Sequence, residues 1–178
     1  TSVDATSVND TPVLSGAVAG QLTNESQNVT PFTTFSIADP DVSQDVTVTI
    51  TLDNAAKGVF TPASLEASGF VAQGSGVYTF TGSASEAVAA MAALSYDPTN
   101  NRVAINSNDT TRFTVTVSDG VATNQTSNTT TVVSRSVNDG PSITNFTVSG
   151  PITRGSNIVL TATGVADPDN TAAVVEFY

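Results

Sequence analysis

Short stretches in which apolar and polar residues alternate run through most of the chain. Residues 46–52 place Val, Val, Ile and Leu on one side and three Thr on the other, and residues 113–117 repeat this pattern. Alternation with a period of two, rich in β-branched residues, is typical of strands with one buried and one solvated face. The same criteria predict further strands at residues 32–37, 76–81, 94–96, 129–133, 143–149, 158–163 and 174–178.

Turn-forming residues separate these strands at short intervals, with Gly, Pro, Asn and Asp between most of them. This spacing predicts an all-β protein built as an antiparallel Greek-key β-sandwich. One segment departs from the pattern, because Ser83 and Glu86 form a Ser-x-x-Glu capping box in front of an alanine-rich run. We therefore expect one short helix over residues 84–93, with Val88, Met91 and Ala92 packed inward.

A repeated motif divides the chain into modules. The stretch Ser7–Pro12 (SVNDTP) recurs as Ser136–Pro141 (SVNDGP), and an Asp-Pro-Asp follows each copy after nearly the same interval, at residues 39–41 and 167–169. Tandem modules produce such matched spacing. The repeat predicts a linker from a preceding module (1–8), a complete sandwich (9–139) and the first strands of a second sandwich (140–178). About three strands cannot close a sandwich, so we expect the rest beyond residue 178 or from a neighbouring chain, and favour the former.

Composition excludes several classes of site. The 178 residues include 16 Asp and Glu against 5 Lys and Arg, a net charge of −11, with no His and no Cys. The chain therefore lacks the side chains of Ser–His–Asp and Cys–His nucleophile systems and the usual ligands of zinc, haem and iron–sulfur clusters. Any metal must be bound by oxygen, as Ca²⁺ or Mg²⁺ is. The scattered basic residues disfavour nucleic acid, and no apolar run approaches the ~20 residues of a membrane span.

Acidic residues are expected to gather at both ends of the sandwich if its strands alternate in direction. The predicted N-terminal junction contains Asn9, Asp10, Asp39, Asp41 and Asp119. The predicted C-terminal junction contains Glu25, Asn108, Asp109, Asn138 and Asp139, together with Asp167 and Asp169 of the next module. Two unit charges 4 Å apart repel by about 4 kcal/mol at an effective dielectric constant near 20, so such clusters call for a counter-ion. Ca²⁺ accepts 6–8 oxygens in flexible geometry and suits these loops better than Mg²⁺. The alternative is that Asp-Pro, Asn-Asp and Asp-Gly serve only as turn formers.

The chain also resembles a known family. Both copies of the repeat, Asn24–Ser26, Asp39–Asp41 and Val115–Gly120 are similar to the cadherin-like tandem modules of large bacterial surface and secreted proteins, over about residues 1–141. Residues 143–178 resemble a bacterial immunoglobulin-like module, through Thr161–Asn170 and Val174–Tyr178.

In cadherins, a linker Asp-x-Asn-Asp-Asn, a Glu after the first strand, a downstream Asp-x-Asp and an Asp near the end of a late strand bind calcium between domains. Carried to this chain, the resemblance implies ligands at Asn138, Asp139, Glu25, Asp167 and Asp169, and at Asp119 on the opposite end. This chain departs from the cadherin pattern at several positions. The first Asp of the linker is replaced by Ser7 and Ser136, its last Asn by Gly140, and the family's Asp-Arg-Glu by residues 106–109. These departures imply one or two calcium ions per junction.

These observations together predict a non-catalytic extracellular module of a large bacterial repeat protein, stiffened by calcium and acting in cell adhesion or as a spacer. Its expected partners are neighbouring modules of the same polypeptide, with a surface polysaccharide or another cell-surface protein left open. A carbohydrate-binding module of a secreted polysaccharide-active enzyme is the alternative, although the chain has no Trp and its three Tyr fall in or beside strand patterns. Catalysis is not expected, because the carboxylate pairs all lie in polar loops rather than in an apolar pocket.

Overall fold

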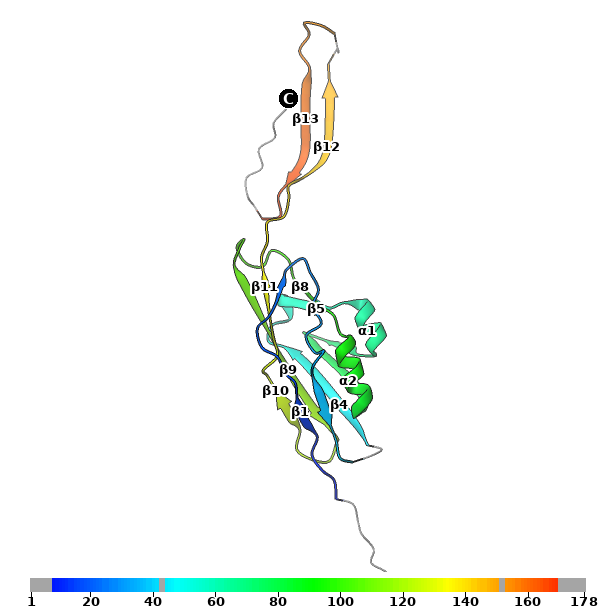
Figure 1. Ribbon diagram of the computed structural model, residues 1–178. Helices are drawn as coiled ribbons and strands as arrows, with labels where there is room; N and C mark the ends of the chain where they lie inside the picture. Colours follow the sequence, from blue (N-terminus) through cyan, green and yellow to red (C-terminus); the bar gives the residue numbers. More distant parts are fainter. Residues whose placement is uncertain (1–7, 42–43, 151–152, 170–178) are drawn as a thin grey trace, which may run out of the picture.

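The computed structural model describes residues 8–41, 44–150 and 153–169. Most of these residues form one β-rich body, and a separate hairpin extends from its C-terminal end (Figure 1). The strands of the body are β1 (Val13–Ser15), β2 (Gln21–Asn24), β3 (Ser36–Ala38), β4 (Asp45–Leu52), β5 (Gly58–Phe60), β6 (Val71–Gly74), β7 (Val77–Ser83), β8 (Tyr96–Pro98), β9 (Asn108–Ser118), β10 (Gln125–Ser127) and β11 (Thr131–Arg135).

One large sheet organises the body. Its strands lie in the order β2-β11-β9-β4-β7-β6, with β10 also paired to β9, and two small sheets are formed by β1 with β3 and by β5 with β8. The described strand pairs are antiparallel, as predicted, except that β2 and β11 run parallel. Since β2 and β11 are joined through the whole body rather than by a tight hairpin, nothing local imposes an antiparallel pairing on them.

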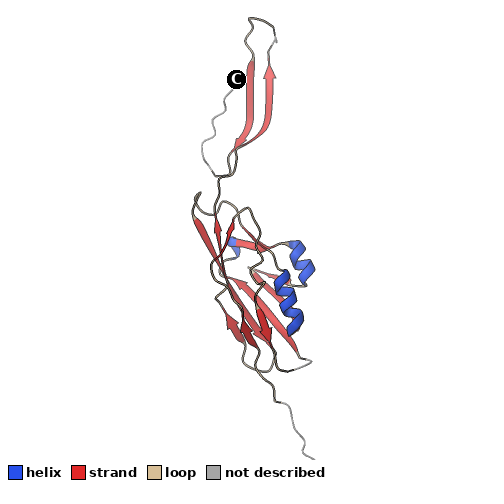
Figure 2. Cartoon of the chain, viewed as in Figure 1, coloured by secondary structure: helices blue, strands red, loops and turns tan. Residues whose placement is uncertain are grey.

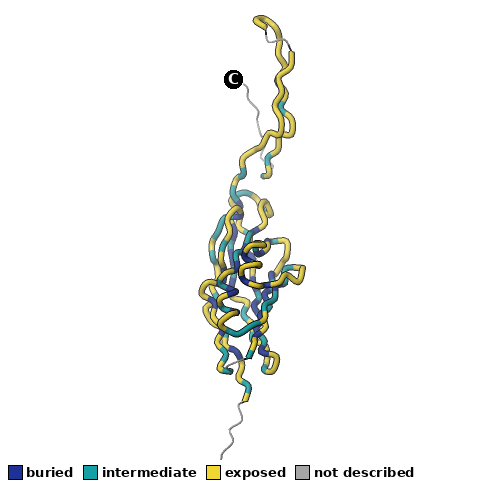
Figure 3. Tube along the Cα trace, turned by 90° about the vertical axis from the view of Figure 1, so that its right-hand side faces the viewer, coloured by how far each residue is buried: buried dark blue, intermediate teal, exposed yellow. Residues whose placement is uncertain are grey.

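The core lies on one face of the large sheet. Val46, Val48 and Ile50 of β4 are fully buried while the alternate threonines are more exposed, and β9 buries Phe113, Val115 and Val117 in the same way. This confirms the predicted alternation in both strands. Aromatic side chains from the small sheets complete the core: the Phe113 ring centroid lies 5.8 Å from that of Phe60 and 5.1 Å from that of Tyr96. Figure 3 shows this buried interior inside an exposed surface.

The predicted helix is confirmed as α2 (Ala84–Ala93), which packs against β3, β4 and β7. Its capping box is complete, since the Ser83 hydroxyl accepts from the Glu86 amide and a Glu86 carboxylate oxygen accepts from the Ser83 amide. Met91 is buried as expected, but Ala87 and Ala90 are the other buried residues of the helix. Val88 is half-buried and packs against the core, as expected, whereas Ala92 is only half-buried and Ala87 and Ala90 take its place on the inward face.

The expectation of a single helix is wrong. A second helix, α1 (Pro62–Ser68), lies beside α2, and a 3-10 turn spans Ala55–Lys57 (Figure 2). Thr61 caps α1, Pro62 begins it, and Gly69 ends it in the left-handed conformation at φ 74°. Among the described residues, neither α-helix is long and apolar enough to cross a membrane.

Other predicted strands correspond to β7, β8, β11, β12 and β13 with shifted ends. The strand expected at 32–37 begins only at Ser36, because the Phe35 amide donates to the Phe32 carbonyl and both rings turn into the core. The strand predicted at 174–178 lies outside the described residues.

The C-terminal hairpin comprises β12 (Ser142–Ser149) and β13 (Val159–Ala166). It projects beyond the body, and its side chains are largely exposed (Figures 1 and 3). The last strand of the body ends at Arg135 and the hairpin begins at Ser142, on either side of the predicted module boundary at 139/140. A complete second sandwich remains a prediction.

Candidate metal centre at the module junction

Glu25 is a buried carboxylate at the C-terminal end of the body. It follows β2 directly and is only 3% exposed. One carboxylate oxygen accepts from the Asn101 amide at 2.8 Å, and the other accepts from the Ser136 hydroxyl at 2.9 Å and the Val137 amide at 3.0 Å. Glu25 therefore ties the end of β2 to the loop at Asn101 and to the linker that leaves β11.

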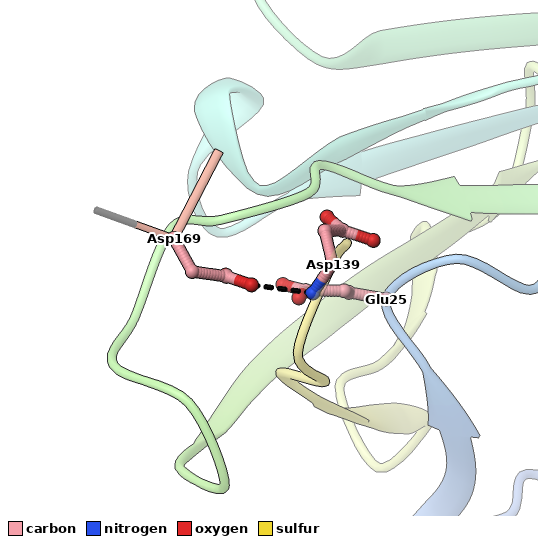
Figure 4. Close-up of side chains that lie close together, drawn as sticks. All are labelled: Glu25, Asp139 and Asp169. Carbon is pink, nitrogen blue, oxygen red and sulfur yellow. Dashed lines mark hydrogen bonds between the residues drawn. The ribbon is translucent and has the colours of Figure 1, made fainter. Parts of the chain in front are cut away.

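Asp139 and Asp169 bring two further carboxylates to Glu25. Oxygens of the three side chains lie within 4.8 Å of one another (Figure 4). The Asp139 amide donates to Asp169 Oδ2, and the Asn101 side-chain amide donates to Asp139 Oδ2 at 3.2 Å. Three segments far apart in the sequence thus converge where the hairpin meets the body.

Asp167 and Asn138 shape the loops that present these carboxylates. The Asp169 amide donates to Asp167 Oδ1 at 3.0 Å across Pro168, whose ring fixes the backbone between them. The Asn138 side-chain amide donates to the Asp139 carbonyl at 3.1 Å. Both contacts hold the turn geometry of segments predicted from the repeat.

The N-terminal junction has the same hydrogen bonds at the equivalent positions. The Asn9 side-chain amide donates to the Asp10 carbonyl at 3.1 Å. The Asp10 amide donates to Asp41 Oδ2, and the Asp41 amide donates to Asp39 Oδ1 at 3.0 Å. Each of these bonds has its counterpart at Asn138, Asp139, Asp167 and Asp169. The sequence repeat is therefore also a repeat of local structure.

Asp119 joins the N-terminal junction at the end of β9. Its Oδ2 accepts from the Asn9 side chain at 2.9 Å, and its Oδ1 accepts from the amides of Val121 and Ala122. The Asn9 bond, and after it the Val121 bond, lower the pKa of Asp119 below its ordinary value. Nearby, Asp39 Oδ2 is a buried oxygen without a hydrogen-bond partner among the described residues. The five residues predicted for this junction thus lie in two linked sets, Asn9 with Asp119 and Asp10 with Asp39 and Asp41.

Asp109 does not join the C-terminal cluster. Its Oδ2 accepts from Arg102 Nε at 2.7 Å, and its Oδ1 lies 3.9 Å from Lys57 Nζ. Two cations thus already lie beside this carboxylate, which stands outside the group of Glu25, Asp139 and Asp169, and its role as a metal ligand stays a prediction. Asn108, its neighbour, starts β9 and is exposed on the strand.

Asn101 is the participant that the sequence did not reveal. It contacts both Glu25 and Asp139 from a loop, with a left-handed backbone at φ 58°. The signal was present but weak, since an Asn-Asn pair after a strand is a common turn that Asn tolerates in this conformation.

The oxygens of Glu25, Asp139 and Asp169 fit a calcium ion. Ca²⁺ binds oxygen at 2.3–2.6 Å, so two of its ligands lie at most about 5 Å apart, whereas oxygens on Mg²⁺ lie at most about 4.2 Å apart. All three oxygens lie within 4.8 Å of one another, a bound that satisfies the calcium limit but does not by itself distinguish the two ions. In the described part of the chain, the ion pairs join Lys57 and Arg102 to Asp53 and Asp109, so none of them neutralises these three carboxylates.

Comparisons with known proteins add no family. No protein-family model, curated protein or solved structure matches this chain. Function is therefore inferred from the residues of the two junctions.

Proposed function

We propose that the chain is a non-catalytic, Greek-key cadherin-like module of a longer bacterial surface or secreted protein, stiffened by Ca²⁺ at its junctions and serving in adhesion or as a spacer. The observation that carries this proposal is the recurrence of one hydrogen-bonded linker at both ends of the body. At the C-terminal end, this linker also meets a buried glutamate. Neighbouring modules of the same polypeptide are the partners that this arrangement implies.

Calcium would act as an electrostatic link between modules. Each pair of carboxylates about 4 Å apart repels by about 4 kcal/mol at an effective dielectric constant near 20, and a divalent cation reverses the sign of the local interaction. Glu25 belongs to the body, Asp139 to the linker and Asp169 to the segment after β13, so one ion held by all three would fix the hairpin relative to the body. Extracellular modules bind Ca²⁺ at about 10⁻⁴–10⁻³ M, so occupancy would follow the calcium concentration of the medium.

Calorimetric titration with Ca²⁺ tests the proposal directly. We expect saturable binding, weakened at least tenfold by Asp139→Asn, because one charged ligand is replaced by a neutral one. Glu66→Gln is the matched control: it removes one negative charge from an exposed position of α1, and the affinity should stay unchanged. Absence of binding at millimolar Ca²⁺, or equal losses in both variants, would contradict the assignment.

A further inference from the structure

A second candidate site lies on the outer face of the large sheet. A hollow of about 600 Å³ is lined by side chains of β2, β9 and β11 and of the loops beside them: Leu22, Thr23, Asn24, Gln27, Asn106, Asn108, Val133 and Arg135. The lining contains four side-chain amides and one guanidinium, and it includes no carboxylate. This is unusual in a chain with 16 acidic and 5 basic residues.

The strand register explains why these side chains gather. Arg135 pairs with Asn24 of β2 on one side and with Asn108 of β9 on the other, and Val133 pairs with Leu22 two residues away. Directly paired residues project from the same face of a sheet. Val132 and Ser134 are buried on the opposite face, so the guanidinium with its two flanking amides, and the Leu–Val pair beside it, project outward.

Arg135 is held in place without being neutralised. Its Nη2 donates to Asn106 Oδ1 at 2.7 Å, and it forms no ion pair with any residue that the structure describes. Asn106 has a left-handed backbone at φ 67°, a conformation that Asn tolerates. The guanidinium is thus pre-oriented and still has donors to offer.

The amides around Arg135 have unused hydrogen-bonding capacity. The side chains of Asn24, Gln27 and Asn108 make no hydrogen bond within the described ranges, although each has two donor hydrogens and an acceptor oxygen. Leu22, at 80% exposure, adds an apolar surface beside them. Open amides next to a small apolar patch complement the hydroxyl groups and the C–H face of a sugar ring.

We propose that this hollow binds a sugar that carries a carboxylate, such as a uronic acid residue of an acidic polysaccharide. Arg135 would pair with the carboxylate in the fork geometry that guanidinium favours. Asn24 and Asn108 would bind hydroxyls, and Leu22 would contact the ring. The donors belong to the body alone and include none of the three carboxylates of the proposed calcium site, so sugar binding can be measured without calcium.

The test is an NMR titration of the ¹⁵N-labelled chain with a trimer of galacturonic acid. A chelator is present throughout, so that no divalent cation bridges the protein and the sugar. We expect shifts centred on the residues of the hollow, and affinity at least tenfold weaker for Arg135→Gln. Arg112→Gln is the matched control, because Arg112 is exposed on the same face of β9 but outside the hollow. It removes the same charge and should leave the affinity unchanged.

Further probes separate the alternatives. The neutral galactose trimer should bind at least tenfold more weakly than the acidic one, and equal binding would overturn the role of the carboxylate. Tighter binding of tri-glutamate would identify an acidic peptide as the ligand and overturn the sugar assignment. Equal losses of affinity in Arg135→Gln and Arg112→Gln would show that binding depends only on the overall charge of the chain, and would overturn the site. If Arg135→Gln does not fold, Asn108→Ala decides: a several-fold loss supports the hollow, and no loss overturns it.

Discussion

Glu25 organises the C-terminal junction through its own hydrogen bonds, before any cation is considered. Its two carboxylate oxygens accept from Asn101, Ser136 and Val137, so the linker is already held against the body. A metal that binds there meets a carboxylate whose position is fixed, which lowers the entropy lost on binding. This buried residue therefore has two roles, one in the fold and one in the proposed calcium site.

Replacing Glu25 by Gln should separate these roles. The substitution preserves the shape but turns one acceptor oxygen into an NH₂ group, which faces the donors that the carboxylate satisfied. We expect the free energy of unfolding in chelator to fall by about 1–3 kcal/mol, measured by urea denaturation. Glu66→Gln, on the surface of α1, should change it by less than about 0.5 kcal/mol. An unfolding curve of Glu25→Gln that overlays the parent curve would show that these hydrogen bonds contribute nothing.

Tyr96 predicts how stability depends on alkaline pH. Its hydroxyl donates to the Lys57 carbonyl and is hydrogen-bonded to Thr111, and burial raises its pKa to about 12. An unfolded tyrosine titrates near pH 10. Between about pH 10 and pH 12, the unfolded chain loses this proton while the folded chain keeps it, so stability is full below pH 10 and falls as pH rises. Tyr96→Phe should reduce that fall when unfolding free energies are measured across the range. Parallel pH profiles for the two proteins would contradict the assignment.

Helix α2 depends on its N-cap residue, Ser83, and on one buried side chain, Met91. Ser83→Ala removes the acceptor of the capping box and should lower the free energy of unfolding by about 1 kcal/mol. Met91→Ala, at a fully buried position, should lower it by about 2–5 kcal/mol because a cavity remains. Ser85→Ala removes only the 3.2 Å hydrogen bond between its hydroxyl and Ser83 Oγ and leaves both bonds of the capping box, so it should lower the free energy of unfolding by less than Ser83→Ala does. Equal effects at Ser83 and Ser85 would show that the cap does not stabilise the helix.

The elements that the sequence predicted best are those with long local patterns. Strands β4 and β9 alternate over many residues, and α2 carries both a capping box and an apolar run, so short-range rules suffice. Helix α1 has seven residues and β5 and β10 have three each, too few to show a period. The apolar residues Phe32 and Phe35 predict a strand, but they form a turn because tertiary packing draws both rings into the core.

The residues of the candidate site that a local sequence pattern marks were predicted, and those that depend on tertiary packing were not. The repeat pointed to Asp139 and Asp169, because equivalent loops recur with equivalent spacing. The ion pairs of Asp109 with Arg102 and Lys57 depend on how distant loops pack, and no local pattern shows them. The hollow around Arg135 escaped prediction for a related reason, since it exists only once β2 has paired in parallel with β11.

At the scale of the whole molecule, the two junctions lie at opposite ends of the body (Figure 1). Residues 9 and 10 lead into β1 at one end, and residues 138 and 139 leave towards the hairpin at the other. Modules joined in this way would form a string, with each acidic cluster between two bodies. The outer face of the large sheet would then remain accessible along the string, so stiffening and ligand binding could use separate surfaces.

Calcium should therefore change the dimensions of this chain through its C-terminal junction. We expect small-angle scattering in millimolar Ca²⁺ to give a narrower distribution of interatomic distances than in chelator, because the hairpin becomes fixed relative to the body. Asp139→Asn should abolish that change, whereas Asp10→Asn, at the equivalent position of the other linker, should preserve it, because only the C-terminal cluster joins the body to the hairpin. Binding at 100 times the dissociation constant would also add about 2.7 kcal/mol to stability. Identical scattering with and without calcium, in a chain that calorimetry shows to be saturated, would mean that the ion binds without stiffening the linker.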